Sequence, residues 1–212
     1  MLSPLRRSAL EHVRRYAGVY FFLTVLFAMG VAFGALAVGA LDATQRLELG
    51  HYLEFFLQTL EQPGEAVPAQ SIVRQALLSN WRTAGLIFLL GLTVVGVPLI
   101  PAIVFLRGFI VGFAVGFLVS SDGWRGLLIS LLAILPQNVL IVPALIVLSA
   151  AAVTFSARLV RPGPGRPSLW RFVVSYLTTA AACFIALAVA SVLEGYVAPL
   201  FLRLVAGYSD GF

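Results

Sequence analysis

Apolar side chains fill residues 16–41, 83–120, 126–157 and 172–195 almost without interruption. A run of about 20 such residues is long enough to cross the hydrocarbon core of a bilayer as an α-helix. The run at 83–120 is too long for one crossing, so we expect it to fold back and supply two spans, 83–99 and 101–120. The pattern predicts an all-α polytopic membrane protein with about five transmembrane helices in a single domain, residues 1–212.

Glycine recurs at every fourth position in the segment RGFIVGFAVGF, residues 107–117. Residues four apart stack on one face of a helix, so these glycines make a smooth strip that another backbone can approach closely. The first run holds a similar pair in GVAFG, although two glycines so spaced also occur by chance in glycine-rich helices. We expect helix packing through small residues at Gly30, Gly34, Gly108, Gly112, Gly116, Ala182 and Ala186.

Prolines and polar side chains interrupt the two longest runs. A proline leaves the carbonyl four residues earlier without its donor, and Gln or Asn amides can satisfy such groups. A charge in the membrane is a functional-site hypothesis by default. For the arginine we favour a structural role, either snorkelling to the cytoplasmic interface or capping freed carbonyls. We expect broken helices and intramembrane polar groups at Pro98, Pro101, Arg107, Pro136, Gln137, Asn138 and Pro143.

One sizeable polar segment, residues 42–80, carries five carboxylates against two arginines. Asp42 and Gln45 resemble a capping box, and the apolar side chains that follow have the spacing of an amphipathic helix. We predict an extracytoplasmic amphipathic helical hairpin lying over the ends of the spans. Its apolar face either binds partners or simply covers the bundle, and it comprises Leu49, Leu53, Phe56, Leu57 and Leu60.

Composition and charge agree with a membrane location. The chain is 60% hydrophobic and 11% charged, which a soluble domain of this size cannot cover with polar surface. Its basic residues are all arginine and lie at the ends of the apolar runs, which argues against nucleic-acid binding. A cytoplasmic amino terminus puts nine of the 14 arginines inside. We therefore expect a multi-pass protein of the bacterial cell membrane, with a cytoplasmic loop at 158–171.

The sequence offers little chemistry for catalysis. It has no zinc-protease motif, no phosphate-binding loop and no nucleophile elbow, and its one cysteine, Cys183, has no partner in the chain. His51 lies beside Glu48 and Glu54, but two kinds of ligand on a solvated helix are more typical of a polar face than of a metal site. We expect neither an enzyme nor a metal or cofactor.

Three segments together resemble a known family. They are GLTVVGVPLIPAIVFLRGFIVGFAVGFLV, the pair Gly123-Trp124, and LPQNVLIVPALIVLS. The chain resembles stage II sporulation protein M over roughly Arg6 to Leu204, although that family has lysine at some positions where this chain has arginine, notably in the segment that matches Arg107. The resemblance implies a non-enzymatic polytopic membrane protein of endospore formation. Wider relatives also occur in organisms that do not sporulate.

The resemblance also implies partners. In that family the M protein is regarded as a scaffold that acts with the sporulation proteins D and P, a lytic transglycosylase and an amidase-endopeptidase, to thin septal peptidoglycan during engulfment. We therefore expect a membrane scaffold that recruits these peptidoglycan hydrolases. The alternative is a channel or transporter subunit that uses the broken helices. Because the spans offer more small-residue faces than one bundle consumes, we also expect a homodimer.

Overall fold

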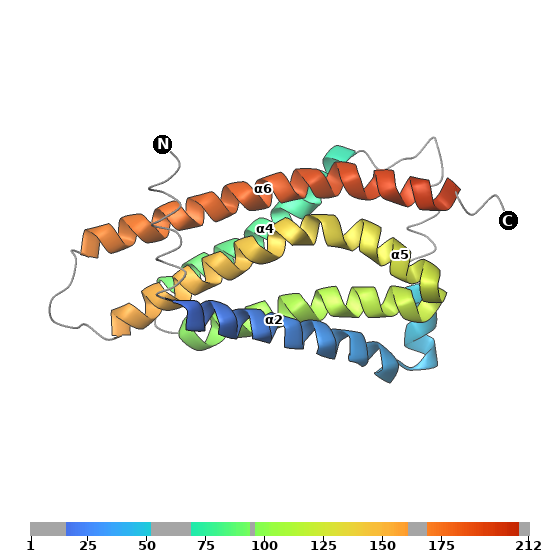
Figure 1. Ribbon diagram of the computed structural model, residues 1–212, viewed down its shortest axis with the longest axis horizontal. Coiled ribbons are helices and arrows are strands. Elements are labelled where there is room, and N and C mark those ends of the chain that lie inside the picture. Colours follow the sequence, from blue (N-terminus) through green and yellow to red (C-terminus); the bar gives the residue numbers. More distant parts are fainter. Residues whose placement is uncertain (1–15, 52–68, 94–95, 161–168, 208–212) are drawn as a thin grey trace.

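The computed structural model describes residues 16–51, 69–93, 96–160 and 169–207, and within these ranges the regular structure is entirely helical. The helices are α2 (Ala17–Ala37), continued by the short 3-10 helix η1 (Val38–Ala40), α4 (Ala69–Gly91), α5 (Gly96–Val160) and α6 (Leu169–Gly207), and residues 43–51 are also helical (Figure 1). The expected all-α polytopic architecture is therefore confirmed.

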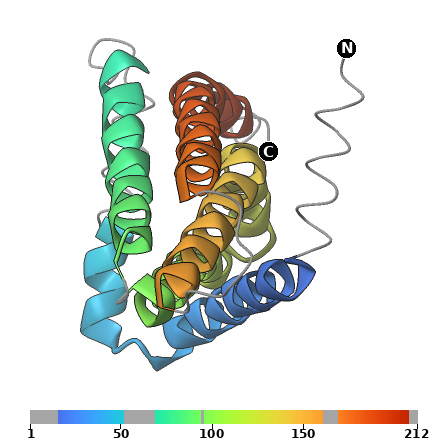
Figure 2. The ribbon, with the colours of Figure 1, turned by 90° about the vertical axis from the view of Figure 1, so that its left-hand side faces the viewer.

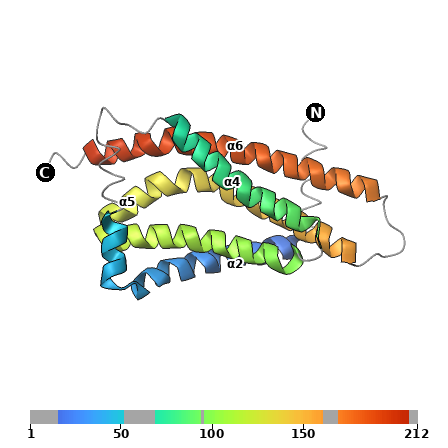
Figure 3. The ribbon, with the colours of Figure 1, turned by 180° about the vertical axis from the view of Figure 1, so that it is seen from behind.

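Four helical segments in the described part are long and apolar enough to cross a membrane: Ala17–Ala40, Gly96–Ser121, Gly126–Leu159 and Phe172–Tyr196. The helix α4 is more polar, but it too runs along the bundle. Residues 43–51 lie at the far end of α2, whereas α4 ends beside the beginning of α2 (Figures 1 and 3). Thus α4 returns the chain to the end of the bundle where it started.

The long helix α5 is a hairpin of two antiparallel arms, which we call the first arm (residues 96–121) and the second arm (residues 126–159) (Figure 1). The chain reverses at Gly123, whose φ of 56° and ψ of −121° belong to a region that only glycine adopts readily. A side chain at Gly126 would collide with the carbonyl oxygen of Leu118, so the reversal is also tight. Glycine is therefore required at both positions.

The helices α2 and α4 lie on different sides of α5, and α6 covers a third side (Figure 2). Most of the buried core joins α4, α6 and both arms, and it includes Ile87, Ile100, Leu148 and Leu187. A smaller cluster links α2 to the arms through Leu23, Val104 and Ala150. Each helix thus buries one face against α5, which is the centre of the fold.

The expected boundary between spans 83–99 and 101–120 is corrected by the structure. The helix α4 ends at Gly91 and α5 begins at Gly96, so the chain turns before the prolines. Gly96 donates its N–H to the carbonyl of Thr93 at 3.3 Å, and Ser156 also donates to that carbonyl. Pro98 lies in the first turn of α5, where backbone N–H groups have no helical partner, so it costs no hydrogen bond there.

The predicted helix breaks at the other prolines are also wrong. The helix α5 runs through Pro101, Pro136 and Pro143 without leaving helical geometry, and its second arm bows along its length (Figure 1). In a bundle, neighbouring helices and small backbone adjustments compensate for the missing N–H. The interruption of α5 therefore comes from glycine at position 123, and the first arm is a full span rather than a short helix.

The hairpin expected at 42–80 is only partly described. Residues 43–51 are helical, and the Asp42 N–H donates to Gln45 Oε1 at 3.1 Å, which is half of the expected capping box. Leu49 is half-buried, whereas Leu53, Phe56, Leu57 and Leu60 lie outside the described residues. The second short helix of the hairpin, expected at residues 71–78, is instead the first part of α4, which buries Ala76 and Asn80 against the bundle.

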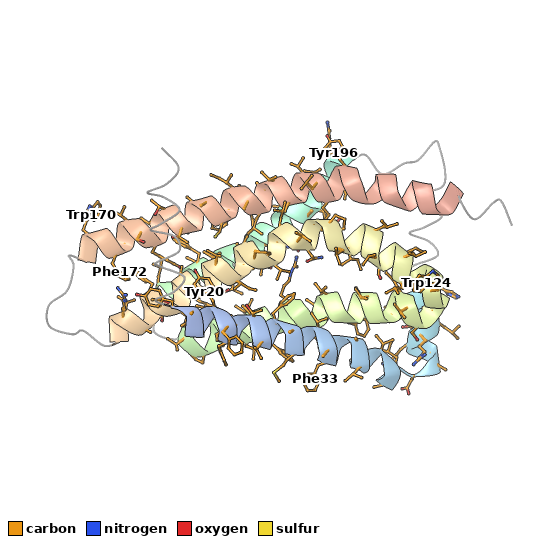
Figure 4. The ribbon with its side chains drawn as sticks, in the orientation of Figure 1. Tyr20, Phe33, Trp124, Trp170, Phe172 and Tyr196 are labelled. Carbon is orange, nitrogen blue, oxygen red and sulfur yellow. The ribbon has the colours of Figure 1, made fainter. Side chains whose placement is uncertain are left out.

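Exposed tryptophans lie near the two ends of the bundle. Trp124 stands at the α5 reversal and Trp170 at the start of α6, on opposite ends of the molecule (Figure 4). Each is 73% exposed. Tryptophan is enriched at both membrane–water interfaces, so this placement agrees with a bundle that crosses the bilayer along its long axis.

Candidate functional site

The helix α2 and the first arm of α5 contact each other through their backbones. A Cβ atom added at Gly30 or Gly34 would lie closer than 3.0 Å to the carbonyl oxygen of Phe105 or Phe109, respectively. Such a distance is not tolerated between real atoms, so both positions require glycine. The two helices therefore approach at the glycines of α2.

Glycines of the first arm contribute to the same contact. Cβ atoms at Gly108 and Gly112 would collide with the carbonyl oxygens of Phe27 and Val31, and one at Gly116 would lie 2.9 Å from Cα of Ala35. Glycines of each helix thus face the backbone of the other over several turns. Close packing of this kind is a main source of association between membrane helices. We call these five glycines the glycine contact.

The small residues expected to pack in the last span differ in their burial. Ala182 is exposed and Ala186 half-buried, whereas the buried face of α6 includes Tyr176, Cys183 and Leu187. Tyr176 donates to the carbonyl of Phe88 on α4 at 2.8 Å, and its ring stacks on that of Phe155. The helix α6 is therefore held by this aromatic contact together with part of its small-residue face, because Ala186 packs against the core and Ala190 is fully buried in it.

Arg107 lies near the middle of the first arm. It follows Gly96 by eleven residues, about 16 Å along the axis of a 26-residue span. Its Nη2 donates to Oδ1 of Asn80 on α4 at 3.0 Å. Asn80 Nδ2 in turn donates to Oγ of Ser191 on α6, also at 3.0 Å. A chain of hydrogen bonds thus joins three helices in the interior.

Both Asn80 and Ser191 are almost fully buried, at 2% and 0% exposure. Glu194 lies three residues beyond Ser191, and its carboxylate and the Arg107 guanidinium attract each other electrostatically. The buried Nε of Arg107 has no acceptor among the described residues. We call Arg107, Asn80, Ser191 and Glu194 the polar cluster, and it is the candidate functional site because buried charge in a membrane is expensive.

Neither structural role expected for Arg107 is observed. Its guanidinium points to Asn80 rather than to an interface. The carbonyl that Pro101 leaves free belongs to Val97, ten residues or nearly three helical turns before Arg107. A cavity of about 10 Å³ beside Arg107 is lined otherwise by apolar groups and Thr83, and includes Phe27, Ile87 and Leu145. This volume accommodates about one water molecule.

The expected polar positions of the second arm form a separate feature. Gln137 is buried, and Asn138 Nδ2 donates to the carbonyl of Ile134 at 2.7 Å. Asn138 also lines a mainly apolar groove of about 480 Å³ between the two arms, whose walls include Val111 and Leu131. These residues therefore do not join the polar cluster, and the structure does not bring them to Arg107.

Arginines also fix both ends of the bundle. Arg46 donates to the carbonyls of Val38 and Leu41, where α2 and η1 end, and to Ser120 Oγ at the end of the first arm. At the opposite end, the Arg158 guanidinium lies 3.7 Å from the centre of the Phe172 ring. Cation–π contacts of this type join the end of α5 to the start of α6.

The potential metal ligands are not gathered in the described part of the chain. His51 is exposed there, and within that part no three histidine, cysteine or acidic side chains come together as a metal site would require. Cys183 is buried in the core.

Sequence reasoning missed Asn80, Ser191 and Glu194. Asn80 falls in the segment expected to form a surface hairpin, and Glu194 falls at the very end of the last apolar run, 172–195, without an expected partner. The signal that was available is the carboxylate near the end of an apolar run, because an acidic residue at that position is rare unless it has a partner.

Comparison with protein families places the chain in a known family. A family model described as Stage II sporulation protein M matches residues 23–199, which is most of the chain and includes every residue of the glycine contact and the polar cluster. No curated protein and no solved structure gave a significant match.

Proposed function

Because the chain belongs to the stage II sporulation protein M family, we propose that it is a non-enzymatic membrane scaffold for peptidoglycan hydrolases of the sporulation protein D and P type. In this role it holds the hydrolases at the septal membrane while the wall is thinned for engulfment. Family membership indicates a sporulation-related membrane protein, and the recruitment of hydrolases is the proposal.

The observation that carries the proposal is the glycine contact. Five glycines allow the backbones of α2 and the first arm to contact each other directly. The two helices therefore cannot slide or separate without losing packing along their length. A scaffold needs rigidly placed ends, and both helices end close to residues 43–51, which we propose face the outside (Figure 3). The bundle thereby presents a fixed platform at one end.

The polar cluster supports a scaffold better than a channel. The space beside Arg107 amounts to about 10 Å³, and most of its lining is apolar. A conducting path requires polar groups that replace the hydration shell of an ion along the whole pore. In the proposal, Arg107 instead fixes α4 and α6 against α5 by hydrogen bonds.

We propose that the amino terminus is cytoplasmic, so that residues 42–68 and the α5 reversal lie outside. The arginine distribution supports this orientation. Accessibility of a single cysteine introduced at Ser120 or at Ser168, measured in a Cys183→Ser background with a membrane-impermeant thiol reagent on intact cells, tests it. Labelling is expected at position 120 only.

Co-purification tests the scaffold itself. The full chain, extracted in mild detergent from sporulating cells, is expected to carry a peptidoglycan hydrolase with it. A triple variant, Leu53→Ser, Phe56→Ser and Leu57→Ser, is expected to lose the hydrolase. A matched variant on the lipid-facing side of α6, Ile185→Ser, is expected to retain it, because Ile185 is 67% exposed there and distant in sequence from the hairpin. Equal recovery from all three proteins, or no hydrolase with any, contradicts the proposal.

A further inference from the structure

The outer face of α4 is largely polar from Ser71 to Arg82, although this helix runs along the membrane-spanning bundle, and it becomes apolar beyond, at Leu86 and Leu89. Arg74, Gln75, Ser79 and Arg82 are exposed, and they line a groove of about 660 Å³ along α4. Gln75, Ser79 and Arg82 follow Arg74 by one, five and eight residues, which places all four on one side of the helix. The opposite side holds the buried residues Ala76, Asn80, Ala84 and Ile87. The helix therefore has two distinct faces, and its polar face points away from the core.

These arginines lie at membrane depth. Gly91 ends α4, and the first span of α5 begins five residues later at Gly96. Arg82 precedes Gly91 by nine residues, about 14 Å, and Arg74 by 17 residues, at most about 26 Å. The hydrocarbon core is about 30 Å thick.

A hydrogen bond inside the bundle independently supports this depth. Asn80 bonds to Arg107, which lies about 16 Å into the first arm. Arg82 follows Asn80 by two residues, so it lies at a similar depth but is turned about 200° round the helix. A guanidinium at this position faces outward near the centre of the membrane.

An outward-facing charge at this depth requires a partner. Neither Arg74 nor Arg82 forms a hydrogen bond or ion pair with another of the described residues. Ionisable side chains within membrane spans almost always face a protein interior or a polar cavity, because exposure to hydrocarbon is costly. The outer face of α4 is thus expected to be covered by a group that accepts hydrogen bonds and carries negative charge.

A second copy of the chain fits this face poorly. The four apolar spans contain one carboxylate, Glu194, which is half-buried and is attracted electrostatically by Arg107 of the same chain. Pairing of two α4 faces would bring arginine against arginine, which is repulsive. An anionic lipid carries its charge at the interface, away from Arg82. The remaining source of charge complementarity is another membrane protein.

We propose that the outer face of α4 docks a transmembrane helix of another protein, and that this helix carries a carboxylate at mid-membrane depth, opposite Arg82. Gln75 and Ser79 hydrogen-bond the same helix, and Leu78, which is 46% exposed, packs against its apolar side chains. This docking goes beyond the hydrolase proposal, because it applies to any partner with such a helix.

The test uses the full chain in phosphatidylcholine vesicles and a synthetic probe. The probe is a leucine-alanine transmembrane peptide with one central glutamate, and the control peptide has leucine at that position. Binding is measured by energy transfer between a dye on the chain and a dye on the peptide. The glutamate peptide is expected to bind about tenfold more tightly than the leucine peptide.

Substitutions test whether the preference for the glutamate peptide arises at the outer face of α4. Arg82→Gln is expected to remove most of the preference for the glutamate peptide, and Arg82→Lys to keep most of it. Arg74→Gln is expected to reduce it less, because Arg74 lies nearer the membrane surface. Ile185→Ala, a change on the exposed side of α6, is expected to leave the preference intact.

Several results would overturn the proposal. One is equal binding of the two peptides by the unmodified chain, a comparison that does not depend on any variant folding. A second is a preference that survives Arg82→Gln. A third is energy transfer between copies of the chain that is lost in Arg82→Gln, which would make a second copy the occupant. A fourth is complete loss of the preference when phosphatidylglycerol is added, which would make the face a lipid site.

Discussion

Nη2 of Arg107 on α5 donates a hydrogen bond to Oδ1 of Asn80 on α4, with 3.0 Å between the two atoms, in the interior of the bundle. The bond joins the first arm of α5 to the one helix that is too polar to count as a span by its composition. Asn80 in turn donates a hydrogen bond to Ser191 of α6. The arginine therefore links helices that are distant in sequence, and this link can be tested by removing its members singly and together.

Replacement of Asn80 by leucine is expected to destabilise the bundle by about 2 to 4 kcal/mol, because Arg107 keeps its charge but loses its buried acceptor. The double variant Asn80→Leu with Arg107→Leu is expected to recover part of this loss, since an apolar pair leaves no unpaired charge. Denaturant titration in bicelles, followed by circular dichroism, measures both. Strictly additive losses in the double variant would show that the two side chains are not coupled.

Alanine at Gly112 is expected to cost about 1 to 3 kcal/mol, because the added methyl group collides with the carbonyl of Val31 and forces α2 away from α5. Alanine at Gly85 on α4 is the matched control, since nothing lies within 4 Å of the position its Cβ would occupy. Gly85→Ala is expected to be neutral or slightly stabilising. Equal effects of the two substitutions, in the same denaturation assay, would contradict the backbone contact.

The reversal of α5 depends on the conformation of one glycine. Gly123→Ala is expected to cost about 1 to 3 kcal/mol, although its new methyl group would meet no atom within 4 Å. The cost arises from the backbone, whose φ of 56° and ψ of −121° are strained for any side chain. Gly39→Ala also meets no atom and has an ordinary backbone, so it should lack the penalty. Thermal unfolding of both variants in the same detergent compares them.

Tyr176→Phe isolates the hydrogen bond between α6 and α4. It removes the donor to the Phe88 carbonyl but keeps the ring that stacks on Phe155, so a loss of about 1 kcal/mol is expected. Tyr196→Phe is the control, because Tyr196 is 59% exposed and points away from the bundle (Figure 4). A larger loss at position 196 than at 176 would be inconsistent with this role.

We also propose that the chain forms a homodimer. Since the outer face of α4 suits another protein better than a second copy, self-association is expected to persist in Arg82→Gln. Detergent-corrected mass measurement is expected to give twice the 22.7 kDa mass of the chain for both proteins. A monomer mass for the unmodified chain at all concentrations would refute the dimer.

Much of the fold follows directly from residue patterns. The apolar runs are long, and membrane helices must satisfy their backbone groups internally, so the all-α architecture and the approximate positions of most spans could be predicted. The four-residue glycine period at 108, 112 and 116 also predicts a close helix contact, because in a membrane small residues mark the faces where backbones approach. Both signals are local in the sequence, so the predictions drawn from them do not depend on how the helices pack together.

The turns could be predicted only in part. Prolines at 98, 101, 136 and 143 indicated broken helices, but a proline in the first turn loses no hydrogen bond, and packed neighbours compensate for the others. The first reversal instead lies between Gly91 and Gly96. The second lies at Gly123, inside the expected gap between the runs that end at residue 120 and begin at residue 126, so its position could be predicted.

The polar cluster could not be predicted from the sequence for a different reason. Asn80 precedes an apolar run and belongs to a helix whose outer face is polar, so residues 69–80 resembled a surface helix. Its burial depends on α4 continuing to Gly91 and on Arg107 lying at the same depth in another helix. Such a match of depths between residues 27 positions apart is a tertiary property, which single-sequence patterns do not reveal.

The most direct test of the scaffold is to identify what contacts residues 42–51 in sporulating cells. A photo-crosslinking amino acid at Leu47, which is 64% exposed, reports on that end of the bundle, and one at Phe21 on the exposed side of α2 is the control. Mass spectrometry of the crosslinked products is expected to find a peptidoglycan hydrolase at position 47 and not at position 21. Crosslinks at position 47 that contain no hydrolase, or the same products at both positions, would contradict the scaffold.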